Sequence, residues 1–380
     1  MRYVIVGAGI AGTTAAEELR KLDANAEIAL ISEEFEPLYS RVLLTHYAKG
    51  IVPREKLFLK KETWYEEQKI EWLPGTRCES IDAANKHVVL SDGRELPYDK
   101  LLIATGGEPR TLPYEGENAA YFHSLGDTEH LLSLMRAHAN GRGIVYGGSF
   151  IAADLLDVFL HHKISTVAAF RGPWMFHRTL DADSGELISD ALRRAGAQVM
   201  PNAEMLESVG ATQEDIVGVG VGVESDLGWV RDAGIAVEKG ILTNARLETN
   251  VADAYAAGDV AEFDDLVVGR QFQSGNWTAA MTQGRVAARN MAGGTEEYRA
   301  VSSYATKLAG LDIVFVGDTS KPHADEVRTI GNRASGGVTQ LFVRAGKVVG
   351  ATLVGRNADR QPVTAAIRDR LAPDIFSTPL

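Results

Sequence analysis

The chain has 380 residues, of which 45% are hydrophobic and 24% charged, and its formal net charge is −12 at pH 7. This length predicts two or three domains, and the composition is that of an ordinary soluble globular protein. The acidic balance argues against nonspecific nucleic-acid binding, which depends on clustered Lys and Arg. A membrane span needs about 18 apolar residues in succession, and no apolar run approaches that length.

Cysteine usage and the N-terminus bear on redox chemistry and location. Cys78 is the single cysteine, so the sequence has no intramolecular disulfide and no Cys-x-x-Cys pair. Any redox chemistry is therefore expected to come from a bound cofactor. The first residues read as a strand followed by an acidic helix rather than as a signal sequence, which predicts a cytoplasmic protein. His and Cys residues do not cluster in the sequence, so no metal site is predicted.

The N-terminal segment predicts a βαβ unit with parallel strands. Residues 2–9 and 26–34 read as buried strands, and residues 13–22 between them read as a helix. The same pattern recurs over 143–170. Two such units without a short fixed period favour two nucleotide-binding modules over a repeat architecture. Near the C-terminus, apolar runs on both sides of 344–347 predict a hairpin.

Gly7, Gly9 and Gly12 have the G-x-G-x-x-G spacing of a dinucleotide-binding turn. Gly7 permits the tight turn, Gly9 lets the backbone approach a pyrophosphate, and Gly12 lets the helix pack close to the strand. About 20 residues later stand Glu33 and Glu34, where a carboxylate accepts hydrogen bonds from ribose hydroxyls. The preceding strand, the glycine spacing, the following helix and the acidic residues all match a dinucleotide-binding βαβ unit. This unit is therefore predicted to hold a dinucleotide.

The second βαβ unit departs from the strict fingerprint. Its turn has Gly147 and Gly148, followed by Ser149 and Ala152 where a strict pattern has two more glycines. Ser149 is expected to narrow the approach of the backbone to a pyrophosphate, and Ala152 is a milder change. Two interpretations stay open: the turn still binds a dinucleotide, or it is the remnant of such a site.

Three motifs in order carry a resemblance to a known family. The first fingerprint is followed by KLLIATGGEPR at 100–110 and TNVADAYAAGDVAEF at 249–263. Together they resemble the FAD-dependent pyridine nucleotide–disulfide oxidoreductase superfamily. PLYSRVLLTHYAKG at 37–50 and the segment 63–106 resemble one branch, the flavoproteins that reduce rubredoxin, ferredoxin or the nitrite reductase haem–iron–sulfur module. These relatives lack the redox-active disulfide, in agreement with the single cysteine.

The resemblance implies an α/β fold with two Rossmann-like nucleotide-binding domains and a small α+β C-terminal domain. In such a fold an NAD(P)-type domain is inserted into a discontinuous FAD domain. We therefore expect the FAD-binding domain at 1–110 and 241–295, and a shortened NAD(P)-binding-like domain at 111–240. The interface domain is expected at 296–380, and it allows a homodimer.

The resemblance also implies which residues contact FAD. Asp259 takes the place of the residue that binds the ribityl chain, and Cys78 that of a residue whose backbone contacts the adenine. For Cys78, a buried apolar filler is the alternative. Trp277 begins the helix whose N-terminus would point at the flavin, although a core tryptophan is an alternative. The expected FAD contacts are Gly7, Gly9, Ala11, Gly12, Glu33, Glu34, Arg41, His46, Cys78, Ala104, Thr105, Gly106, His123, Asp259 and Trp277.

Three polar residues fall near the expected flavin and nicotinamide, and the two histidines among them allow two interpretations. His46 and His123 fall where relatives have a lysine and an arginine near the flavin, but partly exposed loop histidines are an equal alternative. Asp154 replaces the glutamate that relatives place beside the nicotinamide. Asp154 and His46 are therefore the expected helpers of a flavin-mediated reaction, in which no residue acts as a covalent nucleophile.

The expected NADP contacts are Gly147, Gly148, Ser149, Ala152, Arg171 and Arg178. Arg171 follows Phe170, where NAD-preferring relatives place a ribose-binding acid, and two arginines there would bind the 2′-phosphate of NADPH. Solvated surface charge is the alternative for both. Glu224, where relatives have an arginine, and the short segment 210–215, where they carry a hairpin, argue against binding.

These observations predict an FAD-dependent oxidoreductase that passes electrons between NAD(P)H, with NADPH favoured, and a redox acceptor. The expected partner is a small protein such as rubredoxin, ferredoxin or an iron–sulfur subunit. The alternative is an FAD-containing electron-transfer subunit whose NAD(P)H site is degenerate. A third hypothesis is a noncatalytic FAD-binding or sensor protein. The intact FAD motifs do not separate the three.

Overall fold

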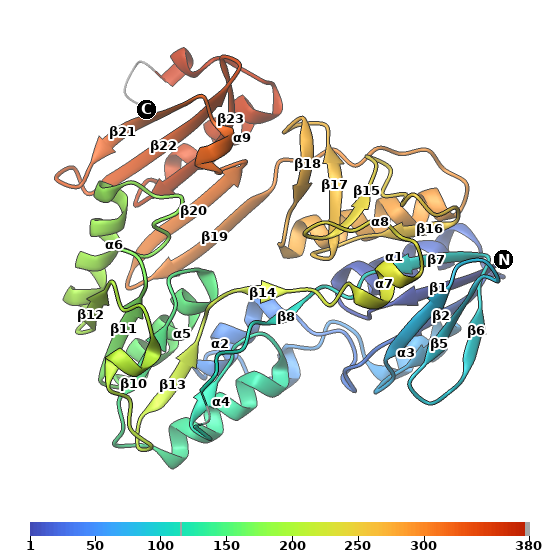
Figure 1. Cartoon of the computed structure of the whole chain (residues 1–380), viewed down its shortest axis with the longest axis horizontal. Helices are drawn as coiled ribbons and strands as arrows, with labels where there is room; N and C mark the ends of the chain where they lie inside the picture. Colours follow the sequence, from blue (N-terminus) through green and yellow to red (C-terminus); the bar gives the residue numbers. More distant parts are fainter. Residues whose placement is uncertain (115, 377–380) are drawn as a thin grey trace. The chain divides into compact units, whose positions relative to one another are not determined.

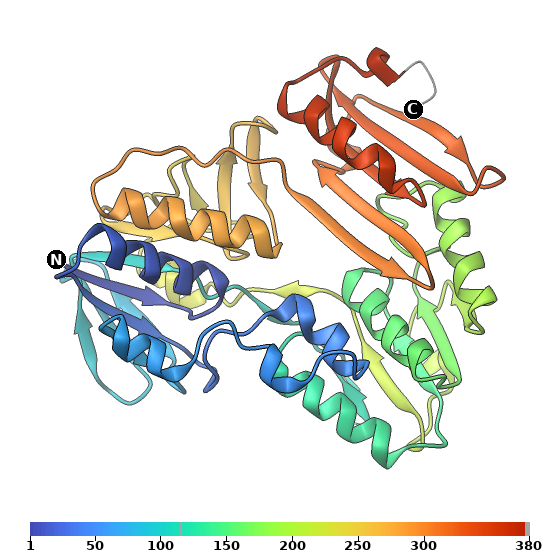
Figure 2. The same cartoon turned by 180° about the vertical axis from the view of Figure 1, so that it is seen from behind.

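The computed structural model describes residues 1–114 and 116–376, which form two compact units (Figures 1 and 2). The first unit comprises residues 1–40, 54–108 and 225–302. The second comprises residues 41–53 and 109–224 together with the chain from 303 onward. Within the described ranges, no helix has the length and apolar character needed to cross a membrane.

The first unit is built on a five-stranded parallel sheet in the order β16-β7-β1-β2-β3. Its strands are mainly apolar and most of their residues are buried, as expected for a parallel sheet covered on both faces. The strands are β1 (Arg2–Val6), β2 (Glu27–Ile31), β3 (Ile70–Leu73), β7 (Lys100–Ile103) and β16 (Ala254–Ala256). Two three-stranded sheets complete the unit: β4 (Cys78–Asp82), β5 (His87–Leu90) and β6 (Glu95–Pro97), and β15 (Ile241–Thr243), β17 (Ala261–Asp265) and β18 (Arg270–Gln273).

Two helices of the first unit pack unusually close together. Helix α1 (Ile10–Leu22) lies beside α8 (Trp277–Met291) in both views (Figures 1 and 2). A Cβ atom at Gly284 of α8 would lie 2.1 Å from the carbonyl oxygen of Ala11, so only glycine permits this approach. The shorter helices are α3 (Glu62–Glu67) and α7 (Gly228–Asp232).

The second unit contains a parallel sheet in the order β12-β11-β10-β13-β9. Its strands are β9 (Ala119–Ala120), β10 (Gly143–Tyr146), β11 (Thr166–Phe170), β12 (Gln198–Pro201) and β13 (Ile216–Val219). The helices in this part of the second unit are α2 (Leu44–Ala48), α4 (Leu125–Ala137), α5 (Phe150–His161) and α6 (Ala182–Arg194). The short strands β8 (Glu108–Pro109) and β14 (Val223–Glu224) pair where the chain passes between the units.

The C-terminal part of the second unit is an antiparallel sheet that carries helix α9 (Arg360–Arg368). The predicted hairpin is present as β22 and β23, which are joined at Ala345 and Gly346. The strands are β19 (Ser303–Leu308), β20 (Leu311–Gly317), β21 (Glu326–Asn332), β22 (Gly337–Arg344) and β23 (Lys347–Val354).

The segment 225–240 lies in the first unit, whereas the sequence-based boundary at 240 had placed it with the inserted domain. Helix α7 packs on β4, and Leu227, Val230 and Ile235 are buried in the same apolar cluster as β1. The segment 41–53 is grouped with the second unit because α2 packs against α4 and α5. Contacts distant in sequence decide both placements.

Candidate dinucleotide-binding sites

The three glycines of the first fingerprint have different reasons to be glycine. Gly7 has a φ of +108°, and a Cβ atom there would lie 2.3 Å from the carbonyl oxygen of Ala104. A Cβ atom at Gly12 would lie 1.9 Å from the carbonyl oxygen of Gly7. A Cβ atom at Gly9, by contrast, would meet nothing within 4 Å, and φ there is −66°. The fold therefore requires Gly7 and Gly12, whereas Gly9 leaves open space.

That open space lies at the N-terminus of α1. Gly9 is the N-cap residue, and among the described side chains none caps this helix. The first N–H groups of a helix have no partners within the helix, and they carry partial positive charge that suits a phosphate. The geometry therefore fits the pyrophosphate of a dinucleotide such as FAD.

The ATG turn after β7 lies against the glycine turn. The Ala104 N–H donates to Val6, and the nearest atoms to a Cβ at Gly7 belong to Ala104 and Thr105. Gly106 has a φ of +71°, and its carbonyl oxygen accepts a 2.8 Å hydrogen bond from the Ser225 hydroxyl. The motifs at residues 4–12 and 100–110 are therefore in direct contact in the structure.

The two acidic residues after β2 have different surroundings. Glu34 is half-buried, and its carboxylate accepts a 2.6 Å hydrogen bond from the Tyr39 hydroxyl. Glu33 is exposed and forms a 3.4 Å ion pair with Arg77. Only Glu34 is thus held by a half-buried hydrogen bond.

The loop that contains Asp259 is positioned from two sides. Gly258 has a φ of +83°, and its N–H donates to the buried Gln283 side chain of α8 at 2.8 Å. The Gln273 side chain donates to the Asp259 carbonyl oxygen at 2.7 Å. Trp277 is half-buried in the first turn of α8, beside the N-cap Asn276.

Cys78 has the surroundings of an unreactive thiol. It is buried, and burial raises its pKa to about 12. Its Sγ lies 3.6 Å from the carbonyl oxygen of Ser80. Because the thiolate is the reactive form, Cys78 is chemically inert at neutral pH.

Arg41 and His123 come together in the second unit. One guanidinium nitrogen of Arg41 lies 3.1 Å from Nδ1 of His123 and 2.7 Å from the His123 carbonyl oxygen. Burial and the charge of Arg41 lower the pKa of His123 to about 4, so the ring is neutral. Because Arg only donates, Nδ1 accepts and Nε2 carries the proton. His46 is exposed on α2 and takes no part in this pair.

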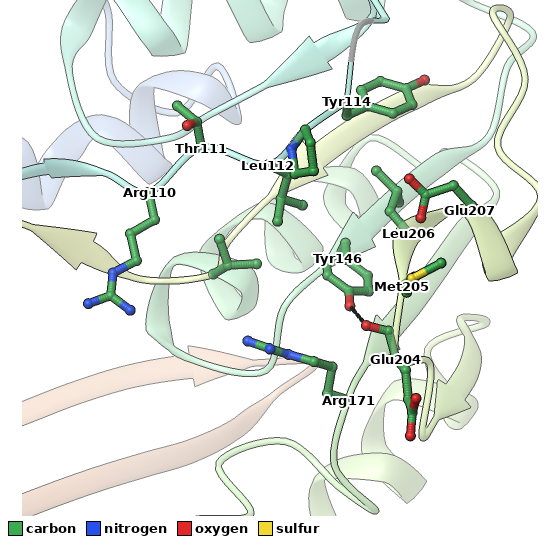
Figure 3. Close-up of a pocket in the computed structure, with 12 residues that line it drawn as sticks. Arg110, Thr111, Leu112, Tyr114, Tyr146, Arg171, Glu204, Met205, Leu206 and Glu207 are labelled. Carbon is green, nitrogen blue, oxygen red and sulfur yellow. Dashed lines mark hydrogen bonds between the residues drawn. The ribbon is translucent and has the colours of Figure 1, made fainter.

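A cavity of about 320 Å³ lies at the carboxyl ends of the parallel strands of the second unit (Figure 3). Ligands bind at this edge in open α/β sheets. Tyr146 ends β10, Arg171 follows β11, and Val221 follows β13. The lining residues are Arg110, Thr111, Leu112, Pro113, Tyr114, Tyr146, Arg171, Glu204, Met205, Leu206, Glu207 and Val221.

The glycine turn of the second unit is tightly packed. Gly147 has a φ of +144°, and a Cβ atom there would lie 2.1 Å from the carbonyl oxygen of Gly220. The Ser149 hydroxyl donates a 3.4 Å hydrogen bond to the same carbonyl oxygen, which places its hydroxymethyl group at the end of β13. A Cβ atom at Gly220 would lie 2.6 Å from the backbone nitrogen of Ala152. Gly220 thus supplies the close approach that a third glycine supplies in the strict motif.

The sequence profile of the family described as "Pyridine nucleotide-disulphide oxidoreductase" matches residues 1–284, which include both glycine turns. The chain belongs to the pyridine nucleotide-disulphide oxidoreductase family. This match confirms the predicted superfamily and the prediction of an FAD-dependent oxidoreductase. The two parallel sheets and the separate antiparallel sheet confirm the predicted fold class.

Relatives agree with this membership. The chain is 31% identical over 321 residues to an NADH-rubredoxin oxidoreductase of Clostridium acetobutylicum, which covers 83% of this chain and 82% of the relative. It is 26% identical over 377 residues to an NAD(P)H nitrite reductase of Bacillus subtilis, which covers 94% of this chain but only 46% of that protein. The solved structure of NADH:rubredoxin oxidoreductase from C. acetobutylicum has a TM-score of 0.86 at 26% identity, covering 100% of this chain and 97% of that chain.

Of the two arginines expected to bind a 2′-phosphate, only Arg171 lines the cavity in this chain. Arg178 is exposed on the same loop but is not a lining residue. Arg110 lines the cavity from the segment after β8, and the sequence analysis had not assigned it a role. The available signal was a basic residue at the end of the ATG motif. Glu224 forms a 3.5 Å ion pair with Arg110, so its charge is compensated.

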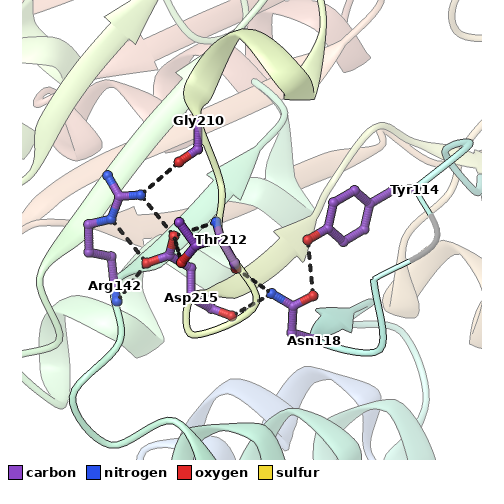
Figure 4. Close-up of polar contacts among 6 residues, drawn as sticks. All are labelled: Tyr114, Asn118, Arg142, Gly210, Thr212 and Asp215. Atoms are coloured by element: carbon purple, nitrogen blue, oxygen red, sulfur yellow. Dashed lines mark hydrogen bonds and ion pairs between the residues drawn. The ribbon is translucent and has the colours of Figure 1, made fainter.

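A polar network supports the cavity wall at Tyr114 (Figure 4). The Tyr114 hydroxyl donates to the Asn118 side chain at 3.0 Å. The Asn118 amide donates to the carbonyl oxygens of Thr212 and Asp215, and Arg142 binds the Asp215 carboxylate. The short segment 210–215 is therefore well anchored, although the hairpin expected from relatives is missing.

Asp154 lies beside a partly buried ion pair. It is on α5 and accepts a 3.3 Å hydrogen bond from the Thr306 hydroxyl of β19. One turn further along the helix, Asp157 pairs with Lys49. Burial raises the pKa of Asp154 to about 7, and Asp157 contributes in the same direction. Asp154 thus holds a proton in mildly acidic solution.

The variant Asp154→Asn is expected to be more stable than the wild type at pH 8. The pKa of Asp154 is about 7 in the folded chain against an ordinary 3.8, so the wild type loses stability as pH rises between these values. The advantage of the variant should grow from about pH 4 and level off above about pH 7 at as much as ~4 kcal/mol. Thermal unfolding across this range measures it. Asp157→Asn is the control and should destabilise, because it breaks the pair with Lys49. An advantage of Asp154→Asn that does not depend on pH would contradict the assignment.

Proposed function

We propose that this protein is an FAD-dependent oxidoreductase that transfers electrons between NADPH and a small electron-transfer protein. The observation that carries the proposal is the cavity at the carboxyl ends of β10 and β11, with Arg171 at its wall. No acid ends β11, and among the described residues Arg171 has no hydrogen-bond or ion-pair partner. A free guanidinium in place of an acid favours the 2′-phosphate of NADPH over the ribose of NADH.

The residues of the first unit fit FAD, which when bound supplies a centre able to take a hydride and pass electrons onward. Gly9 and the uncapped start of α1 would hold its pyrophosphate. Glu34 would accept from a ribose, and Asp259 would bind the ribityl chain. The other residues named for FAD in the sequence analysis stay predictions of contact.

Groups in the second unit have roles that follow from their protonation. Neutral His123 offers an Nε2–H donor, and Arg41 fixes its tautomer. Asp154 keeps a proton at its carboxyl below about pH 7. Lys49, which pairs with Asp157, attracts the Asp154 carboxylate too weakly to offset the effect of burial on its pKa.

The partner is proposed to be rubredoxin, ferredoxin or a similar iron–sulfur protein. Two relatives are named for the reduction of rubredoxin and nitrite, and both names include a pyridine nucleotide. The preference for NADPH rests on Arg171 of this chain and not on those names. A homodimer through the C-terminal sheet and a cytoplasmic location stay predictions.

The test is anaerobic mixing of the purified flavoprotein with NADPH or NADH, followed as bleaching of the flavin band at ~450 nm. We expect NADPH to bleach it faster. Arg171→Ala should slow bleaching by low NADPH about tenfold or more and change the NADH rate less than twofold, because only NADPH has the 2′-phosphate. Arg178→Ala, outside the cavity lining, is the matched control.

Two outcomes would overturn the proposal in different ways. Equal effects of Arg171→Ala on both nucleotides would remove the NADPH preference. No bleaching by either nucleotide, with dithionite still reducing the flavin, would remove the nucleotide site altogether. That result would favour the electron-transfer subunit.

A further inference from the structure

The second arginine of the cavity is already engaged by a carboxylate. Nε of Arg110 lies 3.5 Å from a carboxylate oxygen of Glu224, and both side chains are more than half exposed, at 56% and 63%. The backbone beneath them is held, because the Arg110 N–H donates to the Gly222 carbonyl oxygen at 3.0 Å. The side chains are thus free to exchange partners above a fixed backbone.

The charges of the cavity are segregated. Figure 3 shows the guanidinium groups of Arg110 and Arg171 on one side and the carboxylates of Glu204 and Glu207 on the other. The Tyr146 hydroxyl between these sides lies 2.7 Å from the Glu204 carbonyl oxygen, to which it donates. A phosphate in this cavity is therefore directed to the two arginines.

We propose that Glu224 is a specificity-determining residue that competes with the 2′-phosphate of a nucleotide for Arg110. This inference rests on the proposed function. An ion pair between two exposed side chains in water is weak, whereas a phosphate takes charge-assisted hydrogen bonds from a guanidinium. A nucleotide with a 2′-phosphate displaces Glu224 and is held between Arg110 and Arg171. A nucleotide without that phosphate leaves the Arg110–Glu224 pair intact.

Because of this competition, Glu224 lowers the affinity for one class of nucleotide only. Its carboxylate lowers the affinity for a 2′-phosphorylated nucleotide, because the pair with Arg110 has to break first. It leaves the affinity for a nucleotide with a free 2′-hydroxyl unchanged. The negative charge of Glu224, which in the sequence argues against nucleotide binding, therefore sets the strength of the preference.

The experiment is calorimetric titration of the flavinated full chain with 2′,5′-ADP and with 5′-AMP, two probes that differ in the 2′-phosphate. Glu224→Gln should bind 2′,5′-ADP about threefold more tightly. Arg110→Ala should bind it about tenfold more weakly. Neither variant should change binding of 5′-AMP by more than about twofold. Glu204→Gln is the matched control, because it removes one carboxylate charge at a lining residue that has no ion pair to Arg110, whereas Glu224 lies outside the lining and pairs with Arg110.

Three results would overturn the competition. The first is an equal change for both probes in Glu224→Gln, which would mean a general effect of charge. The second is the same gain in Glu204→Gln as in Glu224→Gln. The third is no change in either Glu224→Gln or Arg110→Ala. In each case bleaching of the flavin by NADPH reports separately whether the proposed function still holds.

Discussion

Gly9→Val yields a folded protein that lacks FAD. The φ of −66° suits any residue, and the new Cβ atom meets no protein atom within 4 Å. The branched side chain instead occupies the space in which the pyrophosphate would approach the backbone. We expect the affinity for FAD to fall at least ~100-fold. The flavin absorbance per protein and the far-UV circular dichroism measure the two parts of this result.

Gly12→Val provides the contrast. Its Cβ atom would lie 1.9 Å from the Gly7 carbonyl oxygen, so this substitution should damage the fold together with flavin binding. A Gly9→Val protein that purifies yellow with a full complement of FAD would refute the placement of the pyrophosphate. So would a Gly9→Val protein that is as poorly folded as Gly12→Val.

Asp215→Ala lowers the stability of the second unit by about 3 kcal/mol. The carboxylate is 5% exposed. It accepts hydrogen bonds from the backbone and guanidinium of Arg142 and from the backbone and hydroxyl of Thr212 (Figure 4). Removing it leaves these partly buried donors without their acceptor, which costs more than the loss of one exposed ion pair.

The dependence on pH follows from the direction of the pKa shift. The Arg142 guanidinium and the other donors hold the pKa of Asp215 well below its ordinary value of 3.8. The stabilisation is therefore present above about pH 4 and is lost as pH falls further. Thermal unfolding at neutral and acidic pH should show the gap between wild type and Asp215→Ala narrowing in acid.

Asp92→Ala is the matched control, because Asp92 forms a 2.6 Å ion pair with Arg94 in which both side chains are close to half exposed. Its loss should lower stability much less than the loss of Asp215. Equal effects of the two substitutions would show that the network around Asp215 adds nothing beyond a surface pair. The network also carries Tyr114, so Asp215→Ala should weaken binding of 2′,5′-ADP as well.

Local patterns in the sequence determined the nucleotide-binding units. The requirement for Gly7 and Gly12, the apolar strands and the hairpin at 344–347 arise from backbone conformation and from residues close in the chain. Side-chain periodicity and turn chemistry are properties of short segments. The two nucleotide-binding units could be predicted from them for this reason, whereas the superfamily and the FAD-dependent oxidoreductase class were implied by the resemblance of three motifs to a known family.

Only the tertiary structure showed which residues line the cavity of the second unit. Arg110 and Arg171 line one cavity although they lie far apart in the chain, whereas Arg178, on the same loop as Arg171, does not line it. The Ser149 hydroxyl donates to the Gly220 carbonyl oxygen. Because Gly220 has no Cβ atom, the backbone at Ala152 can pack closely against it. The carboxyl ends of parallel strands meet at one edge of a sheet whatever their separation in the chain, so side chains gather there without a sequence motif that announces them.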